Sequence, residues 1–158
     1  MNTLREALAA LAAVREASVK EVWVSIVPMD GQRILDGTPL DEAAMALGNG
    51  GAQLIALNCA PVSVMLAALP LFSQAARRAN IRFGCYPNAS EQRADGSWDL
   101  QASTDGRLAE CAVRWMEAGA ALVGSCCGTT PETIRQISLE RDHYLRGMED
   151  ADRLVASR

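Results

Sequence analysis

Short, nearly continuous apolar runs alternate along the chain with segments in which apolar residues recur every three or four positions. The continuous runs are typical of buried strands, and the spaced ones are typical of amphipathic helices. The expected strands are residues 21–28, 52–61, 81–87 and 119–124. The expected helices are residues 4–17, about 41–47, 62–79, a segment around 108–115, and 131–145. Residues 88–106 show neither pattern and are expected to form a long loop.

This order of elements predicts an α/β protein with a parallel sheet. Strands that are apolar on both faces and joined by helical crossovers belong to parallel sheets covered by helices. Four strand–helix units are too few for a complete eight-stranded barrel. They suit either an open four-stranded sheet or half of a (β/α)8 barrel. In both folds, ligand-binding groups belong at the carboxyl ends of the strands.

The composition argues against nucleic acid and a membrane as binding partners. The chain has 158 residues, enough for one domain with its own core, and a formal net charge of −4. No excess of lysine and arginine suggests nucleic-acid binding, and no apolar run reaches the ~18 residues of a membrane span. The N-terminal apolar segment is interrupted by Arg5, Glu6, Arg15 and Glu16. We therefore expect a mature, non-exported chain in the cytoplasm.

The cysteines carry the candidate chemistry. Cys59, Cys126 and Cys127 each end an expected strand, and glycines flank the adjacent pair. A disulfide framework is not expected from an odd number of cysteines in a reducing compartment. Three thiolates without a fourth protein ligand would suit a catalytic zinc site with an open position. Buried packing residues, or a redox-active vicinal pair, remain alternatives on these residues alone.

Other polar or reactive residues are expected to have ordinary roles or supporting ones. Cys85 and Cys111 fall on apolar faces and are expected to be packed in the core. His143 is expected on an exposed helix face. Asn58 and Asn88 stand at strand ends, where they could contact a substrate or simply form turns. Residues 129–132, "TTPE", have the spacing of a helix capping box.

Four segments in the same order resemble the homocysteine S-methyltransferase family. They are "VSIVPMDGQRILDGTPLDEA", "LIALNCAP", "GCYPNASE" with Trp98 downstream, and "VGSCCGTTPETI". Together they cover nearly the whole chain. Ser125 stands where the family pattern has glycine.

The resemblance implies a fold, a cofactor and a reaction. It implies that residues 1–158 form a single partial homocysteine-binding domain, equivalent to the C-terminal half of a (β/α)8 TIM barrel. Cys59, Cys126 and Cys127 take the positions of the family's Zn²⁺ ligands. The expected reaction is zinc-dependent methyl transfer from a small donor to the thiol of homocysteine, giving methionine.

A half-length match also implies a partner. We expect either a homo-oligomer or a separate N-terminal half to complete the barrel. The alternative function is a non-catalytic zinc-binding half-barrel that needs such a partner or second copy to complete its site. The methyl donor is left open by the residues.

Overall fold

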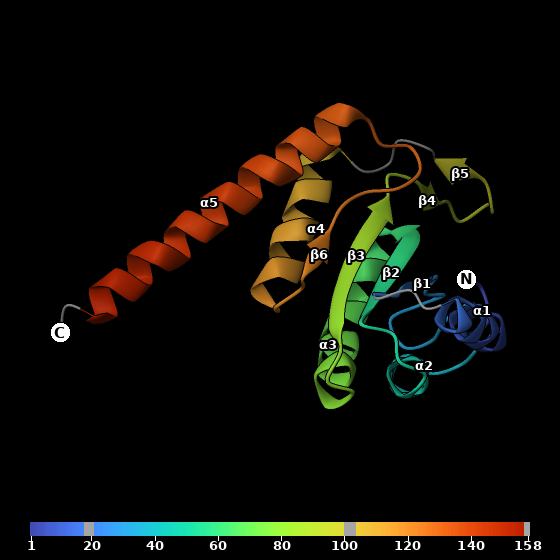
Figure 1. Cartoon of the computed structure of the whole chain (residues 1–158). Coiled ribbons are helices and arrows are strands. Elements are labelled where there is room, and N and C mark those ends of the chain that lie inside the picture. Colours follow the sequence, from blue (N-terminus) through green and yellow to red (C-terminus); the bar gives the residue numbers. More distant parts are fainter. Residues whose placement is uncertain (18–20, 100–103, 157–158) are drawn as a thin grey trace.

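A parallel four-stranded sheet forms the centre of the molecule. The computed structural model describes residues 1–17, 21–99 and 104–156, and its strands follow the order β1-β2-β3-β6 (Figure 1). These strands are β1 (Trp23–Ile26), β2 (Leu54–Pro61), β3 (Arg82–Asn88) and β6 (Leu122–Val123). All three pairings are parallel. The parallel α/β architecture expected from the hydrophobic pattern is therefore confirmed.

Five α-helices accompany the sheet within the described residues. They are α1 (Leu4–Glu16), α2 (Leu40–Asn49), α3 (Val62–Arg78), α4 (Asp105–Glu117) and α5 (Pro131–Ala156). Because neighbouring strands are also consecutive in the chain, right-handed crossovers place the connecting helices on one face of the sheet. The opposite face carries Trp23, whose side chain is 54% exposed. No helix of the described residues is long and apolar enough to cross a membrane.

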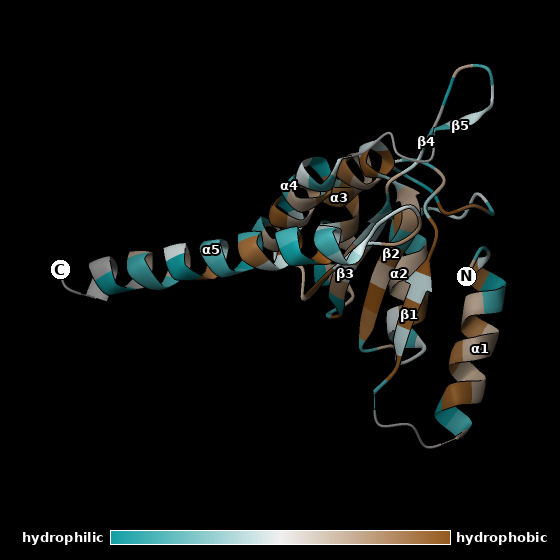
Figure 2. Ribbon diagram, turned by 90° about the horizontal axis from the view of Figure 1, so that it is seen from above, coloured by the Kyte–Doolittle hydropathy of each residue, from teal (hydrophilic) through white to brown (hydrophobic). Residues whose placement is uncertain are grey.

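Aromatic packing fixes α3 and α4 against the sheet. The rings of Phe72, Phe83 and Trp115 contact one another with centroids 6.0–6.3 Å apart. All three side chains are buried, and strands and inward helix faces are the most apolar parts of the ribbon (Figure 2). Burying rings of this size contributes about 2–3 kcal/mol each. The aromatic cluster thus holds β3, and with it the carboxyl end of the sheet, in place.

A close approach of two strands requires glycine at position 84. A Cβ added there would lie 2.4 Å from the carbonyl oxygen of Leu122. No side chain fits that space without moving β6. The short strand β6 is thereby brought close to the centre of β3, and the segment that follows it continues along the end of β3.

The N-terminal end of α1 is fixed by polar contacts. The hydroxyl of Thr3, the N-cap residue, accepts a hydrogen bond from the backbone N–H of Glu6. The Glu6 carboxylate in turn accepts one from the backbone N–H of Asn2, the residue before the cap. The carboxylate of Asp36 also accepts a hydrogen bond from the backbone N–H of Leu4. These bonds anchor α1 beside β1.

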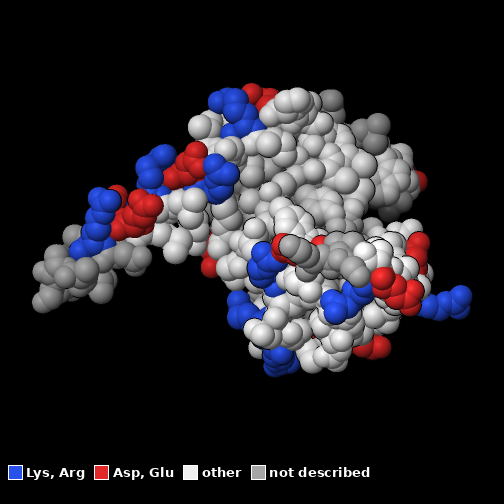
Figure 3. Space-filling model, viewed as in Figure 1, with Lys and Arg blue, Asp and Glu red and all other residues white. Residues whose placement is uncertain are grey.

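Strands β1 and β6 are shorter than the expected 21–28 and 119–124, and three other parts of the chain also differ from expectation. Helix α5 continues to Ala156 rather than ending near Leu145, and basic and acidic side chains lie close together along it (Figure 3). Helix α2 runs through Gly48 to Asn49.

The expected loop over residues 88–106 contains an antiparallel hairpin, β4 (Glu91–Gln92) and β5 (Trp98–Asp99). A tight turn forms it: the N–H of Gly96 donates to Arg93, and Gly96 has a φ of 84°. Residues 100–103 lie outside the described residues.

Candidate metal centre

The first of the three cysteines lies at a break in the regular pairing of β2. Cys59 has a φ of 54°, a left-handed conformation that is uncommon for a residue with a side chain. The pairing of β2 with β3 shifts register between Asn58 and Pro61, as at a β-bulge. Bulges re-aim side chains, and this one lies at the carboxyl end of the sheet. The local strain therefore sets the direction of the Cys59 thiol.

The adjacent cysteines are held to the end of β3 by backbone hydrogen bonds. The N–H of Cys126 donates to the carbonyl of Pro87 at 2.7 Å, and the N–H of Ala89 donates to the carbonyl of Cys127 at 2.9 Å. Gly128, with a φ of 74°, then turns the chain toward α5. The paired segment thus continues beyond β6 and carries both thiols to the same edge as Cys59.

The three sulfur atoms form one cluster. Cys59 Sγ lies 3.5 Å from Cys127 Sγ, and Cys126 Sγ lies 3.8 Å from Cys127 Sγ. All three sulfurs lie within 4.8 Å of one another. A tetrahedral zinc site with Zn–S bonds of about 2.3 Å has sulfur–sulfur edges of about 3.8 Å. The donor set and its spacing therefore fit a metal ion.

Exposure argues against a packing role for these cysteines. Cys59 and Cys126 are partly buried, and Cys127 is exposed. All five cysteines are free thiols. Cys85 and Cys111, by contrast, are fully buried, as expected from the sequence. Burial and contact with Cys111 raise the pKa of the Cys85 thiol well above its ordinary value, so this thiol stays neutral.

The hydrogen bonds within the cluster shift the pKa values of Cys59 and Cys126 in opposite directions. Partial burial acts to raise the pKa of Cys59. Hydrogen bonds from the side chains of Cys126, Cys127 and Asn88 outweigh it, so that the pKa is lowered overall. Burial and the hydrogen bonds to Cys59 and Cys127 raise the pKa of Cys126 to about 12. In the metal-free protein, the Cys59 thiol therefore ionises more readily than the Cys126 thiol.

Buried oxygen atoms accompany the sulfur cluster. The side-chain amide of Asn88 donates to the carbonyl of Cys59 at 3.1 Å, and Asn88 is only 5% exposed. The carbonyl oxygens of the Asn58 and Asn88 side chains, and the hydroxyl of Ser125, are buried without a hydrogen-bond partner among the described residues. Each belongs to a residue that precedes or supports a cysteine. Three polar side-chain atoms of residues next to the cysteines in the chain or bonded to one are thus left unpaired.

The start of α5 differs in detail from the expected capping box. One bond of such a box is present one residue later: the N–H of Thr130 donates to the hydroxyl of Thr133. The Glu132 carboxylate instead accepts hydrogen bonds from the side chains of Arg135 and Gln136. The hydroxyl of Thr129 donates to the carbonyl of Cys126 at 2.6 Å. Thr129 thus orients the peptide that joins the two cysteines, a role the sequence pattern does not reveal.

Asp30, after the first strand, and His143, considered above, are not among the clustered residues. Asp30 closes its own turn by accepting hydrogen bonds from the backbone of Gln32 and Arg33 and from the Arg33 guanidinium. His143 is exposed on α5. The chemistry is therefore concentrated in the three cysteines and their polar neighbours.

Comparison with known proteins agrees with the family resemblance found in the sequence. Residues 1–140 match the family model described as homocysteine S-methyltransferase. The chain is 32% identical over 139 residues to homocysteine S-methyltransferase YbgG of Bacillus subtilis, covering 85% of this chain and 42% of that protein. It is 29% identical over 143 residues to homocysteine S-methyltransferase 1 of Brassica oleracea var. italica, covering 84% of this chain and 41% of the relative.

Solved structures show the same fold. The apo form of the homocysteine methyltransferase MmuM from Escherichia coli aligns with a TM-score of 0.69 at 24% identity, over 88% of this chain and 47% of that chain. A metallated form of MmuM aligns with a TM-score of 0.68 at 24% identity, over 87% of this chain and 41% of that chain. The chain thus spans less than half the length of the relatives it matches.

Proposed function

Because the chain belongs to the homocysteine S-methyltransferase family, we propose that Cys59, Cys126 and Cys127 bind Zn²⁺ in a site for methyl transfer to the thiol of homocysteine. The product would be methionine. One observation carries this proposal: three free thiols from two separate strand ends lie within 4.8 Å of one another. We further propose a cytoplasmic role in methionine biosynthesis.

The donor set determines which metal chemistry is available. Zinc, when bound, supplies the Lewis acidity that keeps a substrate thiol deprotonated near neutral pH, where a free thiol of pKa ~8.5 is mostly protonated. Three protein thiolates carry one negative charge more than the ion neutralises. The excess favours a methyl donor with a positive charge, such as a sulfonium or a quaternary ammonium compound.

The protein's own residues hold and orient the reactants. The bulge at Cys59 and the backbone bonds to Pro87 and Ala89 fix the three sulfurs before a ligand arrives. We propose that Asn58 and Asn88 contact the substrate, since their buried carbonyl oxygens can accept hydrogen bonds from its ammonium group. Leaving such oxygens unpaired costs about 1–3 kcal/mol each, so a ligand that pairs with them gains affinity.

A second candidate function follows from the limited length. The chain covers about two fifths of the relatives' length, and the sheet of the described residues has four strands, with β1 and β6 outermost. A half-barrel of this kind could bind zinc without turnover until a partner or second copy completes the pocket.

Activity measurements separate the two candidates. Purified chain loaded with zinc should be incubated with homocysteine and, in turn, a sulfonium and a quaternary ammonium donor, and methionine quantified by mass spectrometry. The enzyme proposal expects turnover that Cys126→Ala abolishes and Cys85→Ala retains. If the chain binds zinc but forms no methionine from any donor, with or without a separate N-terminal half, the enzyme proposal is wrong and the non-catalytic function is favoured.

A further inference from the structure

A series of hydrogen bonds runs from the start of α4 to the adjacent cysteines. The hydroxyl of Thr133 donates to the carboxylate of Asp105 and accepts from the backbone N–H of Thr130 at 3.1 Å. One residue before Thr130, the hydroxyl of Thr129 donates to the carbonyl of Cys126 at 2.6 Å. This threonine network thus links a carboxylate of α4, through the first turn of α5, to the peptide bond that follows Cys126.

The centre of the threonine network is closed to water. Thr133 is 0% exposed, although its neighbours Glu132 and Ile134 are exposed. A buried hydroxyl is costly to leave without a partner, and no solvent molecule can replace a lost one here. Asp105 therefore fixes the direction of the Thr133 O–H bond, and the lone pairs of the same oxygen remain for the N–H of Thr130.

The first turn of α5 has few other attachments to α4. One other side-chain hydrogen bond of the described residues joins the two helices, at 3.4 Å near the far end of α4, from Tyr144 to the carbonyl of Met116. Their buried apolar contact is small, because Ile137 packs against Ala109 and Ala112. Most of α5 beyond this contact extends away from the body of the molecule (Figure 1). The place where α5 begins therefore depends on its polar bond to α4.

The cysteine segment is fixed on its other side by β3. The backbone of Cys126 and Cys127 bonds to that of Pro87 and Ala89. The chain then turns toward α5 at Gly128, which has a φ of 74°. Glycine restricts the backbone less than any other residue, so such a turn fixes direction only when the chain on its far side is also held. The threonine network supplies that second support.

We propose that Asp105 and Thr133 are positioning residues of the candidate metal centre, which hold the adjacent cysteines in reach of Cys59. Both act through the loop before α5 and neither belongs to the sulfur cluster. This role rests on the proposed zinc site, although the hydrogen bonds themselves exist without a metal. Groups that orient metal ligands raise metal affinity, because less order has to be imposed when the ion binds.

Hydrogen exchange in the metal-free protein tests the positioning. Thr133→Val removes both bonds of the hydroxyl and keeps the shape of the side chain. We expect the amide of Cys126 to exchange about tenfold faster in this variant, while the amide of Gly124, bonded to Cys85 closer to the centre of the sheet, keeps its rate. Thr133→Ser retains the hydroxyl and should restore the wild-type rate. An unchanged Cys126 rate in folded Thr133→Val, or no rescue by serine, overturns the proposal.

Substitutions of Asp105 separate the hydrogen bond from the charge. Asp105→Asn keeps an oxygen that can accept from Thr133, whereas Asp105→Ala does not. Competition with a chelator should show zinc affinity about tenfold lower or more in Asp105→Ala and in Thr133→Val, and close to the wild-type value in Asp105→Asn. Equal losses in the alanine and asparagine variants would assign the effect to charge and contradict a positioning role.

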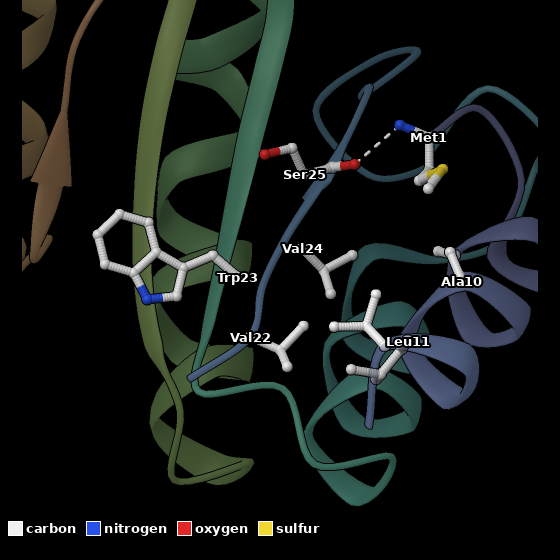
Figure 4. Close-up of a pocket in the computed structure, with 9 residues that line it drawn as sticks. Met1, Ala10, Leu11, Val22, Trp23, Val24 and Ser25 are labelled. Carbon is white, nitrogen blue, oxygen red and sulfur yellow. Dashed lines mark hydrogen bonds between the residues drawn. The ribbon is translucent and has the colours of Figure 1, made fainter. Parts of the chain in front are cut away.

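A matched control lies at the other edge of the sheet. The hydroxyl of Thr3 accepts the capping bond of α1, and α1 lies beside β1 across a hollow of about 340 Å³ lined by Leu11 and Val24 among others (Figure 4). Thr3→Ala therefore removes a threonine hydrogen bond far from the cysteines in the fold. It should change neither the exchange of the Cys126 amide nor zinc affinity. Changes equal to those of Thr133→Val would mean general destabilisation and overturn the proposal.

The two readouts distinguish this role from the proposed function. If the wild-type chain binds no zinc, the proposed function fails, whereas faster exchange in Thr133→Val still supports positioning of the cysteine segment. If zinc binds equally well to the wild type and to Thr133→Val, the zinc site stands and the positioning role is wrong.

Discussion

The side-chain amide of Asn88 donates a hydrogen bond of 3.1 Å to the carbonyl of Cys59, the residue held in a left-handed conformation. This bond joins the end of β3 to the bulge of β2. It supports the peptide that directs one thiol into the sulfur cluster. A buried amide beside a strained residue thus connects the sheet to the candidate metal centre.

Removing this amide should weaken metal binding. We expect Asn88→Ala to lower zinc affinity by about 10–100-fold, the usual effect of losing a group that orients a ligand. Competition with a chromogenic chelator measures the affinity. Asn49→Ala, at the exposed end of α2, serves as the control. Unchanged affinity in the folded Asn88 variant would show that the bond does not position Cys59.

The left-handed backbone at Cys59 should be measurable as strain. Glycine adopts this conformation freely, whereas a residue with a Cβ incurs about 1 kcal/mol or more. In metal-free protein, Cys59→Gly should therefore be more stable than Cys59→Ala by about 1 kcal/mol in urea unfolding. The reverse order would mean that the bulge relaxes when the thiol is removed.

Packing at the β3–β6 crossing gives a test of the fold. Gly84→Ala would push a methyl group to 2.4 Å from the carbonyl oxygen of Leu122 and should destabilise the protein by about 1–3 kcal/mol. Gly147→Ala, where nothing lies within 4 Å of an added Cβ, should be neutral or slightly stabilising. Chemical denaturation of the two variants provides the comparison, and equal stabilities would contradict the described approach of β6.

The start of α5 should respond to acid. Hydrogen bonds from Arg135 and Gln136 lower the pKa of the Glu132 carboxyl to about 2. A lowered folded-state pKa stabilises above the ordinary carboxyl pKa, and this contribution is lost as the pH falls toward 2. Glu132→Gln should therefore lower the Tm slightly near neutral pH and have no effect near pH 2. Glu140→Gln, on the same helix without those bonds, should show no such dependence in thermal scans.

The sequence was sufficient for the order of strands and helices because buried parallel strands are nearly continuous apolar runs. It was also sufficient to single out Cys59, Cys126 and Cys127, whose positions at strand ends bring them to one edge. The β4–β5 hairpin was missed, since two-residue strands have no periodicity to detect. The left-handed backbone of Cys59 has no residue signal either, because cysteine rarely adopts it. The bond from Thr129 to Cys126 depends on a turn that only the assembled site creates.

Metal content tests the central claim most directly. The chain should be purified without chelators and its zinc measured by mass spectrometry, alongside Cys126→Ala and Cys85→Ala. The account predicts about one zinc per chain in the wild type and in Cys85→Ala, and almost none in Cys126→Ala, because an open zinc site needs all three ligands. A folded wild-type chain that binds no zinc, or full zinc retention in Cys126→Ala, would contradict it.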